Sequence, residues 1–272
     1  MNTSESPKSQ VHDTVRGLAL ITGASSGIGR AFARRLATDG YDLIAVGRRR
    51  DRLDELAAEF PNNEVTPLVA DLGTNEGIDA VAKAISASAS LTMLINNAGV
   101  AHYMSFVDLP PDKASELLHV KAVAPAMLAR AAVPAMVTKG RGTIINVSGM
   151  LAFGASAQLG PAAGRATYVA TLAHMVAFSQ ALDEELKSKG IRIQVLCPGI
   201  VATEFHERQG MDLSALPRMS AEDVVTGSLR GLALGELVCA PGVERADLLE
   251  AVVSANLAAF AAQSPQLADR YR

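Results

Sequence analysis

Cysteine is scarce in this 272-residue chain, which contains only Cys197 and Cys239. Two cysteines are too few for a disulfide framework, which excludes a small fold held together by disulfides and favours a reducing cytoplasm. Both cysteines lie inside apolar segments. A catalytic nucleophile is one interpretation of Cys197, but we favour a small buried hydrophobic residue at that position.

Excess charge and long apolar runs are also missing. A formal net charge of −3 at pH 7 provides no basic surface for nucleic acid or for an anionic membrane. No apolar run approaches the length of a bilayer span, and residues 1–15 are polar and lack the apolar core of a secretion signal. We therefore expect a cytoplasmic protein with no nucleic-acid or membrane partner, and a disordered tail over residues 1–15.

Clusters of metal-ligating residues are absent from the sequence pattern as well. No group of His, Cys, Asp and Glu has the spacing of a metal site, and the acidic residues are scattered through amphipathic segments. His119 and His174 have apolar neighbours on expected helices, which is typical of packing histidines. We expect no metal site.

The chain does contain enough apolar sequence for one large α/β domain, with 49% hydrophobic residues and no linker-like division. Apolar runs alternate with amphipathic segments, which predicts right-handed crossovers and a parallel sheet with helices on both faces. Strands are expected at 18–21, 41–46, 64–70, 91–95, 191–197 and 236–240. Helices are expected at about 29–38, 51–59, 75–88, 220–234 and 243–262.

The first strand leads into the most informative stretch of the sequence. The apolar run from Leu18 to Ile21 is followed by Thr22-Gly23-x-x-x-Gly27-Ile28-Gly29 and then by a helix. Glycines let the backbone turn tightly and approach a pyrophosphate, while the next helix presents its N–H groups. The stretch therefore predicts a dinucleotide cradle at the carboxyl end of a strand, where such sheets bind ligands.

The end of the second strand predicts which dinucleotide is bound. A carboxylate here would hydrogen-bond the adenosine ribose hydroxyls and repel a 2′-phosphate, but the chain has Arg48 and Arg49 instead. We therefore predict NADP(H) rather than NAD(H). Arg50 is interpreted as part of the solvated first turn of the next helix.

From Gly17 to about Gly242 the chain resembles the short-chain dehydrogenase/reductase family. The motifs that carry the resemblance are the glycine turn, Asp71-Leu72, Asn96-Asn97-Ala98-Gly99, Asn146-Val147-Ser148, Tyr168 at the start of a long helix, and Pro198-Gly199-x-x-x-Thr203. The resemblance implies a Rossmann-type, doubly wound parallel sheet of about seven strands in a single domain. It also implies a homodimer or homotetramer assembled through the helices that begin near Asp112 and Pro161.

The resemblance and the motifs together give a set of expected cofactor contacts. Thr203 and the backbone near Ile200 are expected to hold the nicotinamide end. The full set is Gly23, Ser25, Ser26, Gly27, Ile28, Gly29, Arg48, Arg49, Asp71, Leu72, Asn97, Ala98, Gly99, Tyr168, Pro198, Gly199, Ile200 and Thr203.

The catalytic pattern departs from the family. Members that reduce carbonyls resemble one another in a tyrosine, a lysine four residues later, a serine and an asparagine, and of these only Tyr168 is clearly present. Leu172 stands where the lysine is expected, so a phenol with an ordinary pKa near 10 lacks its helper cation. Gly149 aligns with the serine. Ser148 is a poor substitute, because neighbouring strand residues point to opposite faces.

Lys121 stands where the family has asparagine and lies on the apolar stripe of its helix. One interpretation is that the helix rolls slightly and the side chain snorkels to the surface. We favour the other, in which Lys121 reaches into the cleft and replaces the cation lost at position 172. It would then polarise Tyr168, bind a ribose hydroxyl, or carry protons itself with a lowered pKa.

The remaining segments divide into a body, a lid and a tail. Residues 16–242 are expected to form the nucleotide-binding domain, with residues 204–219 as a substrate lid carrying Phe205, His206 and Met211. Residues 243–272 are expected to add a helix that packs on the same domain or on a partner subunit. His102, Tyr103 and Arg165 are interpreted as residues of the loop or rim near the cleft.

Three functions are compatible with this pattern. The first is an NADP(H)-dependent oxidoreductase acting on a carbonyl, hydroxyl, imine or enone of an apolar small molecule through an atypical site. The second is non-redox chemistry, such as cyclisation, dehydration or rearrangement, beside a retained nucleotide. The third is a catalytically silent nucleotide-binding protein. We place the oxidoreductase first, on the cofactor motifs and the family resemblance.

Overall fold

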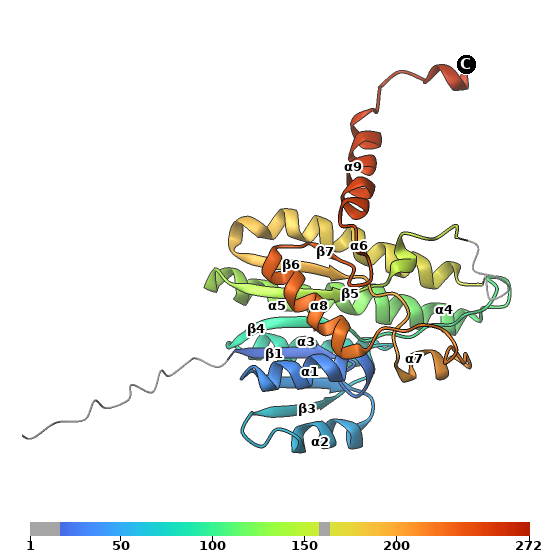
Figure 1. Cartoon of the computed structure of the whole chain (residues 1–272). Helices are drawn as coiled ribbons and strands as arrows, with labels where there is room; N and C mark the ends of the chain where they lie inside the picture. Colours follow the sequence, from blue (N-terminus) through green and yellow to red (C-terminus); the bar gives the residue numbers. More distant parts are fainter. Residues whose placement is uncertain (1–16, 158–163) are drawn as a thin grey trace, which may run out of the picture.

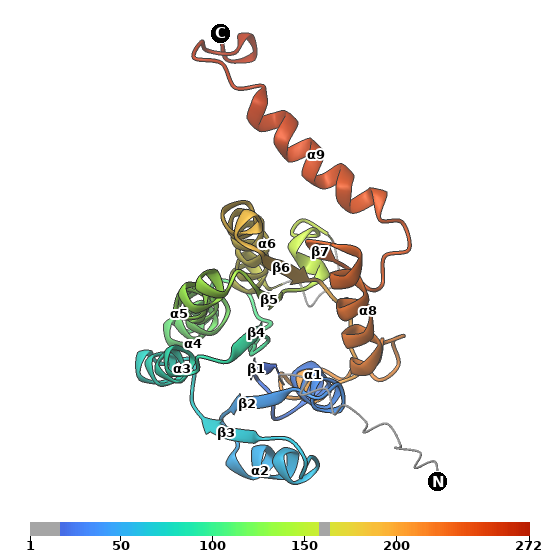
Figure 2. The same cartoon turned by 90° about the vertical axis from the view of Figure 1, so that its left-hand side faces the viewer.

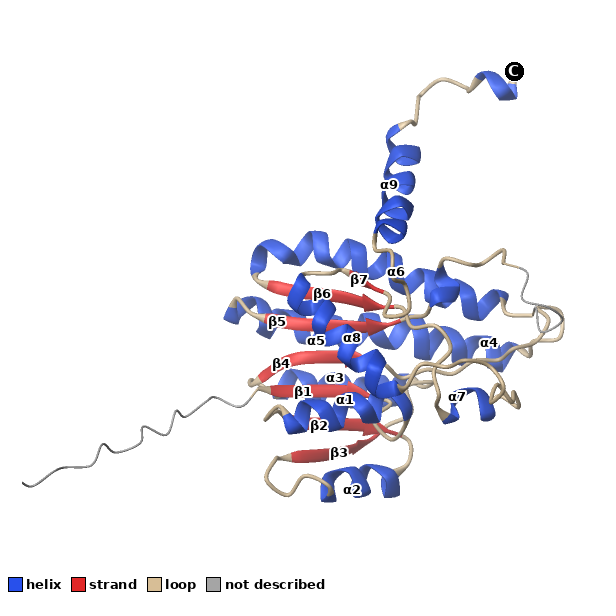
Figure 3. Cartoon of the chain, in the orientation of Figure 1, coloured by secondary structure: helices blue, strands red, loops and turns tan. Residues whose placement is uncertain are grey.

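A single parallel sheet of seven strands, flanked by helices, forms the body of the computed structural model, which describes residues 17–157 and 164–272 (Figures 1 and 3). The strand order is β3-β2-β1-β4-β5-β6-β7, so the chain starts in the middle and winds outward in both directions. This is the predicted Rossmann-type fold. The strands are β1 Leu18–Thr22, β2 Asp42–Gly47, β3 Val65–Val69, β4 Leu91–Asn96, β5 Gly142–Val147, β6 Ile191–Leu196 and β7 Val238–Cys239.

Helices cover both faces of the sheet (Figure 2). One face is covered by α1 Gly27–Thr38, α2 Arg50–Ala58 and α8 Ala221–Leu234, whose apolar residues form one core cluster. The other face is covered by α3 Asn75–Ala87, α4 Pro111–Leu118, α5 Ala124–Lys139 and α6 Ala166–Leu186, whose apolar residues form a second cluster. The expected helix start at Ser220 is confirmed, because its hydroxyl accepts a hydrogen bond from the Asp223 N–H.

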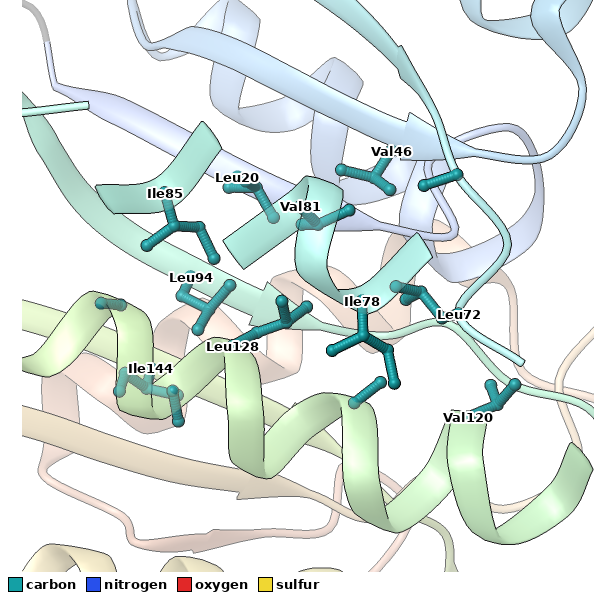
Figure 4. Packing of buried hydrophobic residues seen from close by; sticks show 14 of the residues in the cluster. Leu20, Val46, Leu72, Ile78, Val81, Ile85, Leu94, Val120, Leu128 and Ile144 are labelled. Atoms are coloured by element: carbon teal, nitrogen blue, oxygen red, sulfur yellow. The ribbon is translucent and has the colours of Figure 1, made fainter. Parts of the chain in front are cut away.

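Alternation along the buried strands divides the core between the two faces. Leu20 and Leu94 belong to the cluster under α3 and α5, which Figure 4 shows from close by. Their neighbours Ile21 and Ile95 belong to the cluster under α1 and α8. Successive strand residues point to opposite faces, so a continuous apolar run is required where both faces are covered. The apolar run in β1 satisfies this requirement.

One helical segment, residues 111–139, is long and apolar enough by composition to cross a membrane. It joins α4 to α5 through a π-helical turn, His119–Val123. Leu117 and Leu128 on this segment are fully buried in the core beneath the sheet. The apolar residues of this segment are therefore explained by packing in the core of the domain.

The C-terminal helix differs from its prediction. Helix α9, Asp247–Ala261, lies within the expected range, but it projects away from the sheet and its helices and buries none of its residues (Figures 1 and 2). Leu257 and Phe260 are 63% and 73% exposed. The prediction that this helix packs on the same domain is wrong for the single chain. The expected tail at residues 1–15 and the helix start near Pro161 lie outside the described residues.

Candidate functional site

A cavity with a volume of about 1410 Å³ opens at the carboxyl ends of the strands. Its wall includes every residue of the expected cofactor set except Gly29, and it includes Lys121. Segments far apart in the sequence meet here because the carboxyl ends of parallel strands share one edge of the sheet. The wall also carries the lid residues Phe205, His206 and Met211.

The glycine turn after β1 has the geometry of a dinucleotide cradle. Gly23 and Gly27 have φ values of 71° and 53°, in the left-handed region that side chains disfavour. A Cβ added to Gly29 would collide with the Gly23 carbonyl and lie 2.5 Å from Asn97 Nδ2. Gly29 therefore allows the close packing of the turn, while its neighbours line the cavity.

The Asn97 loop is fixed to the end of β1. Thr22 Oγ1 accepts hydrogen bonds from the backbone N–H groups of Asn97 at 2.9 Å and Ala98 at 3.0 Å. Asn97 Nδ2 donates in return to the Thr22 carbonyl at 2.9 Å. These reciprocal bonds hold two strand-end loops together on one wall of the cavity.

Two arginines stand at the end of β2, each facing a carboxylate. Arg49 donates to Glu204 at 2.7 Å and to Ser25 Oγ at 3.2 Å, while Arg48 lies 3.6 Å from Glu116. Their guanidinium groups keep positive charge at the place where an adenosine 2′-phosphate is expected. Hydrogen bonds from Arg49 and Ser26 lower the pKa of Glu204, against the effect of burial.

Asp71, Leu72 and Thr203, which belong to the expected cofactor set, also line the cavity. Asp71 accepts a hydrogen bond from the Gly73 N–H at 3.0 Å, and the adjoining Leu72 is buried. Thr203 caps the short helix α7, Glu204–Glu207, by accepting from the Phe205 N–H. With the positive-φ glycines and the arginine pair, this donor set fits a phosphorylated dinucleotide.

Tyr168 is paired with another phenol. Its ring centroid lies 5.4 Å from that of Tyr103, in an edge-on arrangement with an interplanar angle of 66°. Burial, and next the charge and hydrogen bond of Tyr103, raise the pKa of Tyr168 well above its usual value. The sequence placed Tyr103 on the rim. Only its position shortly after the Asn97 loop could have indicated a closer role.

Lys121 lies in the interior rather than at the surface. It is 5% exposed, and its Nζ donates to the Val147 carbonyl at 3.3 Å on the cavity wall. Burial lowers its pKa to about 8. The snorkelling interpretation is therefore wrong, and Lys121 lines the cavity. Its replacement of the missing cation stays a prediction.

A π-helical turn positions Lys121. The Ala124 N–H bonds to the His119 carbonyl, five residues back instead of four. Pro125 follows directly, has no N–H, and its ring would clash with the carbonyl of Lys121 in a regular helix. Widening the helix relieves that clash, and such turns occur frequently at functional sites. The sequence carries a signal for this turn in Pro125, which the apolar helical pattern concealed.

Leu172 and Gly149 lie beside each other. A Cβ at Gly149 would lie 3.4 Å from Leu172 Cδ1, an ordinary van der Waals contact. Ser148 turns its hydroxyl to the Leu172 carbonyl at 2.9 Å. The expectation that Ser148 is a poor substitute for the missing serine agrees with this geometry.

The lid contacts the phenol pair. The ring centroids of Phe205 and Tyr168 are 6.5 Å apart. His206 stacks on Tyr103 with ring centroids 6.2 Å apart. Burial lowers the pKa of His206, with Arg218 adding to the shift. Arg165, expected at the rim, is instead 7% exposed and lines the cavity. Within the described ranges 17–157 and 164–272, His, Cys, Asp and Glu form no group able to hold a metal ion.

Comparison with known proteins agrees with this geometry. The short chain dehydrogenase family model matches residues 17–213. A short-chain dehydrogenase from Sphingobium yanoikuyae, solved with NADPH, is 34% identical over 94% of this chain and all of its own, with a TM-score of 0.88. An alcohol dehydrogenase from Comamonas testosteroni, described as specific for bulky-bulky ketones, is 29% identical over 95% of this chain and 99% of its own, with a TM-score of 0.84.

A curated relative covers less of the chain. The very-long-chain 3-oxoacyl-CoA reductase of Bos taurus is 32% identical over 69% of this chain. The match spans 60% of the bovine protein's own length.

Proposed function

Because the chain belongs to the short chain dehydrogenase family, we propose that it is an NADP(H)-dependent oxidoreductase that interconverts a carbonyl and a hydroxyl on an apolar small molecule. The observation that carries the proposal is that the expected cofactor residues, apart from Gly29, and a buried tyrosine line one cavity. The cavity of about 1410 Å³ would hold the dinucleotide and a substrate together, and its Tyr168 end is lined by apolar side chains such as Leu172 and Phe205, which suits a bulky ketone. The Comamonas neighbour supports this substrate class.

NADP(H) is the proposed cofactor. Arg48 and Arg49 would hold the 2′-phosphate, the glycine turn and the first N–H groups of α1 the pyrophosphate, and Thr203 the nicotinamide end. The Sphingobium neighbour with NADPH supports this choice. When bound, the cofactor supplies or accepts the hydride.

Tyr168 is the proposed proton donor to the substrate oxygen. Its raised pKa keeps the phenol protonated at neutral pH, as a donor in the reduction direction must be. After Tyr168 has donated its proton it is a phenolate, and the environment that raises its pKa stabilises this anion poorly. A nearby hydrogen-bond donor or cation is therefore needed on the same wall.

Lys121 is proposed to supply that cation. Its pKa of about 8 lets it exchange protons close to neutrality, which an ordinary lysine does poorly. The π-helical turn points the amine inward from the helix opposite α6, where Leu172 has removed the family's lysine. In this proposal α6 supplies the proton donor Tyr168, and the helical segment that carries Lys121 supplies the cation. In the family both groups usually lie on one helix.

Single-turnover absorbance of NADPH tests the proposal. The protein–NADPH complex is mixed with a panel of bulky ketones, enones and imines. Loss of the NADPH absorbance with matching alcohol or amine product is the expected result. Product formed without an absorbance change would instead favour non-redox chemistry, and tight nucleotide binding without any product would favour a silent nucleotide-binding protein.

We also propose that two or four copies of the chain assemble. Leu118, Val123 and Met127 are 47%, 39% and 47% exposed on the segment joining α4 and α5. Helix α9 presents a second apolar surface that its own domain leaves uncovered. We propose that a second copy of the chain covers both apolar surfaces. We further propose that the protein acts in the cytoplasm and binds neither a membrane nor nucleic acid.

A further inference from the structure

Arg165 is a buried cation whose hydrogen-bonding capacity is incompletely used. Its side chain is 7% exposed, and its Nε has no hydrogen-bond partner among the described residues. One terminal nitrogen donates to the Ala157 carbonyl. Buried guanidinium groups are ordinarily paired with carboxylates, since an unpaired buried charge is costly. An incompletely bonded arginine on a cavity wall indicates a ligand that completes the set.

The carboxylates of the same cavity wall are engaged elsewhere. Glu204 accepts from Arg49, and Glu116 faces His102 at 3.0 Å with Lys113 and Arg48 around it. Asp71 accepts from a backbone N–H in its own turn. The carboxylates on this cavity wall are Asp71, Glu116 and Glu204, and among the described residues none of them forms an ion pair with Arg165.

Arg165 stands close to the chemistry. It precedes the first residue of α6 and lies three residues, or about one helical turn, before Tyr168. Its charge acts on Tyr103, whose ring packs edge-on against that of Tyr168. A group held by this guanidinium therefore lies beside the phenol pair, at the positive end of helix α6.

We propose that Arg165 binds a carboxylate carried by the substrate, so that the substrate is an oxo acid or hydroxy acid with an apolar body. A guanidinium carries five N–H donors, and among the described residues only one terminal nitrogen of Arg165 has an acceptor, so a carboxylate can complete its hydrogen bonds. A single arginine also matches a single negative charge. The assignment rests on the proposed function and makes its apolar substrate more specific by adding an anionic end.

Calorimetric titration of the protein–NADP⁺ complex tests this without requiring turnover. The probes are octanoate, octanamide and octyl phosphate, which share one apolar tail. The expected result is that octanoate binds at least 10-fold more tightly than octanamide. Arg165→Met should remove that preference, lowering octanoate affinity at least 10-fold and octanamide affinity less than 2-fold, while Arg165→Lys should retain part of it.

Arg141→Met is the matched control, because Arg141 is exposed and precedes β5 at the opposite edge of the sheet. It should bind all three probes as the parent does. An unchanged NADP⁺ affinity in Arg165→Met would show that this variant is folded; if it is not, Arg165→Lys alone carries the comparison, with partial loss of the preference expected.

Three outcomes would overturn the assignment. Equal affinity for octanoate and octanamide in the parent is the first. The second is that folded Arg165→Met still binds octanoate more tightly than octanamide. If Arg165→Met does not fold, the second is that Arg165→Lys keeps this preference in full. At least 10-fold tighter binding of octyl phosphate than of octanoate is the third. Failure of the oxidoreductase proposal looks different, since NADPH would stay unoxidised while the octanoate preference remained.

Discussion

Tyr103 and Tyr168 form an edge-on pair of phenols whose ring centroids are 5.4 Å apart. The pair joins the loop after β4 to the first turn of α6 and is covered by the lid residues Phe205 and His206. A tyrosine that acts as an acid depends on what touches its oxygen. Burial raises the pKa of Tyr168 most, and the neighbouring Tyr103 raises it further.

If Tyr168 is the proton donor and Tyr103 raises its pKa, two variants should have altered kinetics. Tyr168→Phe should lower kcat by about 100-fold or more, because general acid catalysis contributes about that much. Tyr103→Phe removes one influence that raises the pKa of Tyr168, so the alkaline limb of the pH–rate profile should move to lower pH. The profile is measured for both variants with a reducible ketone. An alkaline limb left in place by Tyr103→Phe would show that the contact does not tune Tyr168.

The burial of Lys121 predicts a pH-dependent free energy of unfolding. Its pKa in the folded protein is about 8, below that of an unfolded chain, so the unfolded state binds its proton more tightly. The penalty is full below pH 8, amounts to about 3 kcal/mol, and disappears as pH rises through the unfolded-state pKa. Urea unfolding without cofactor should therefore find Lys121→Met more stable than the parent at pH 7, with the gap closing toward pH 10.

Lys83→Met supplies the control for that measurement. Lys83 is exposed on α3, so its replacement should change neither the free energy of unfolding nor its pH dependence. A Lys121→Met variant less stable than the parent at pH 7 would mean that the amine is well solvated in the folded state.

The arginine pair makes a prediction for cofactor choice. Replacing Arg48 and Arg49 by alanine should weaken NADPH binding at least 10-fold and change NADH binding by less than 2-fold, because the 2′-phosphate is the only difference between them. Arg50→Ala is the control, since Arg50 pairs with Asp54 and lies off the cavity wall. Fluorescence titration of both nucleotides checks this. Equal losses for NADPH and NADH would place the phosphate elsewhere.

Helix α9 makes a prediction for assembly. Size-exclusion chromatography with light scattering should give the mass of two or four chains for the parent. Leu257→Ser with Phe260→Ser should lower that mass or weaken the association, because both side chains are more than half exposed in the single chain. A parent that remains monomeric at micromolar concentration would contradict the proposed assembly.

Much of the fold followed from local patterns in the sequence. The apolar run Leu18–Ile21 with its glycine turn predicted β1 and the start of α1 because neighbours in sequence determine those elements. The cavity wall followed from the rule that ligands lie beyond the carboxyl ends of parallel strands. Lys121 was found because an ammonium on an apolar helical stripe needs a special environment.

Other features depend on contacts between distant segments and could not be predicted in this way. The pairing of Tyr103 with Tyr168 arises from where a loop folds over α6, and the burial of Arg165 arises from how the segment before α6 packs near Met104. The position of α9 was wrong because an apolar face indicates that something covers it, but not which surface does so. The π-helical turn had a local cause in Pro125 that the helical pattern concealed.

Stopped-flow NADPH oxidation by the parent and by Lys121→Met, at pH 7 and with saturating ketone, is the decisive comparison. If Lys121 supplies the cation missing at position 172, the parent oxidises its bound NADPH in one turnover. The variant should then react at least 100-fold more slowly, with its NADPH affinity changed by less than 2-fold. Equal rates in the two proteins would contradict the relocated cation, and Tyr168 would have to act without it.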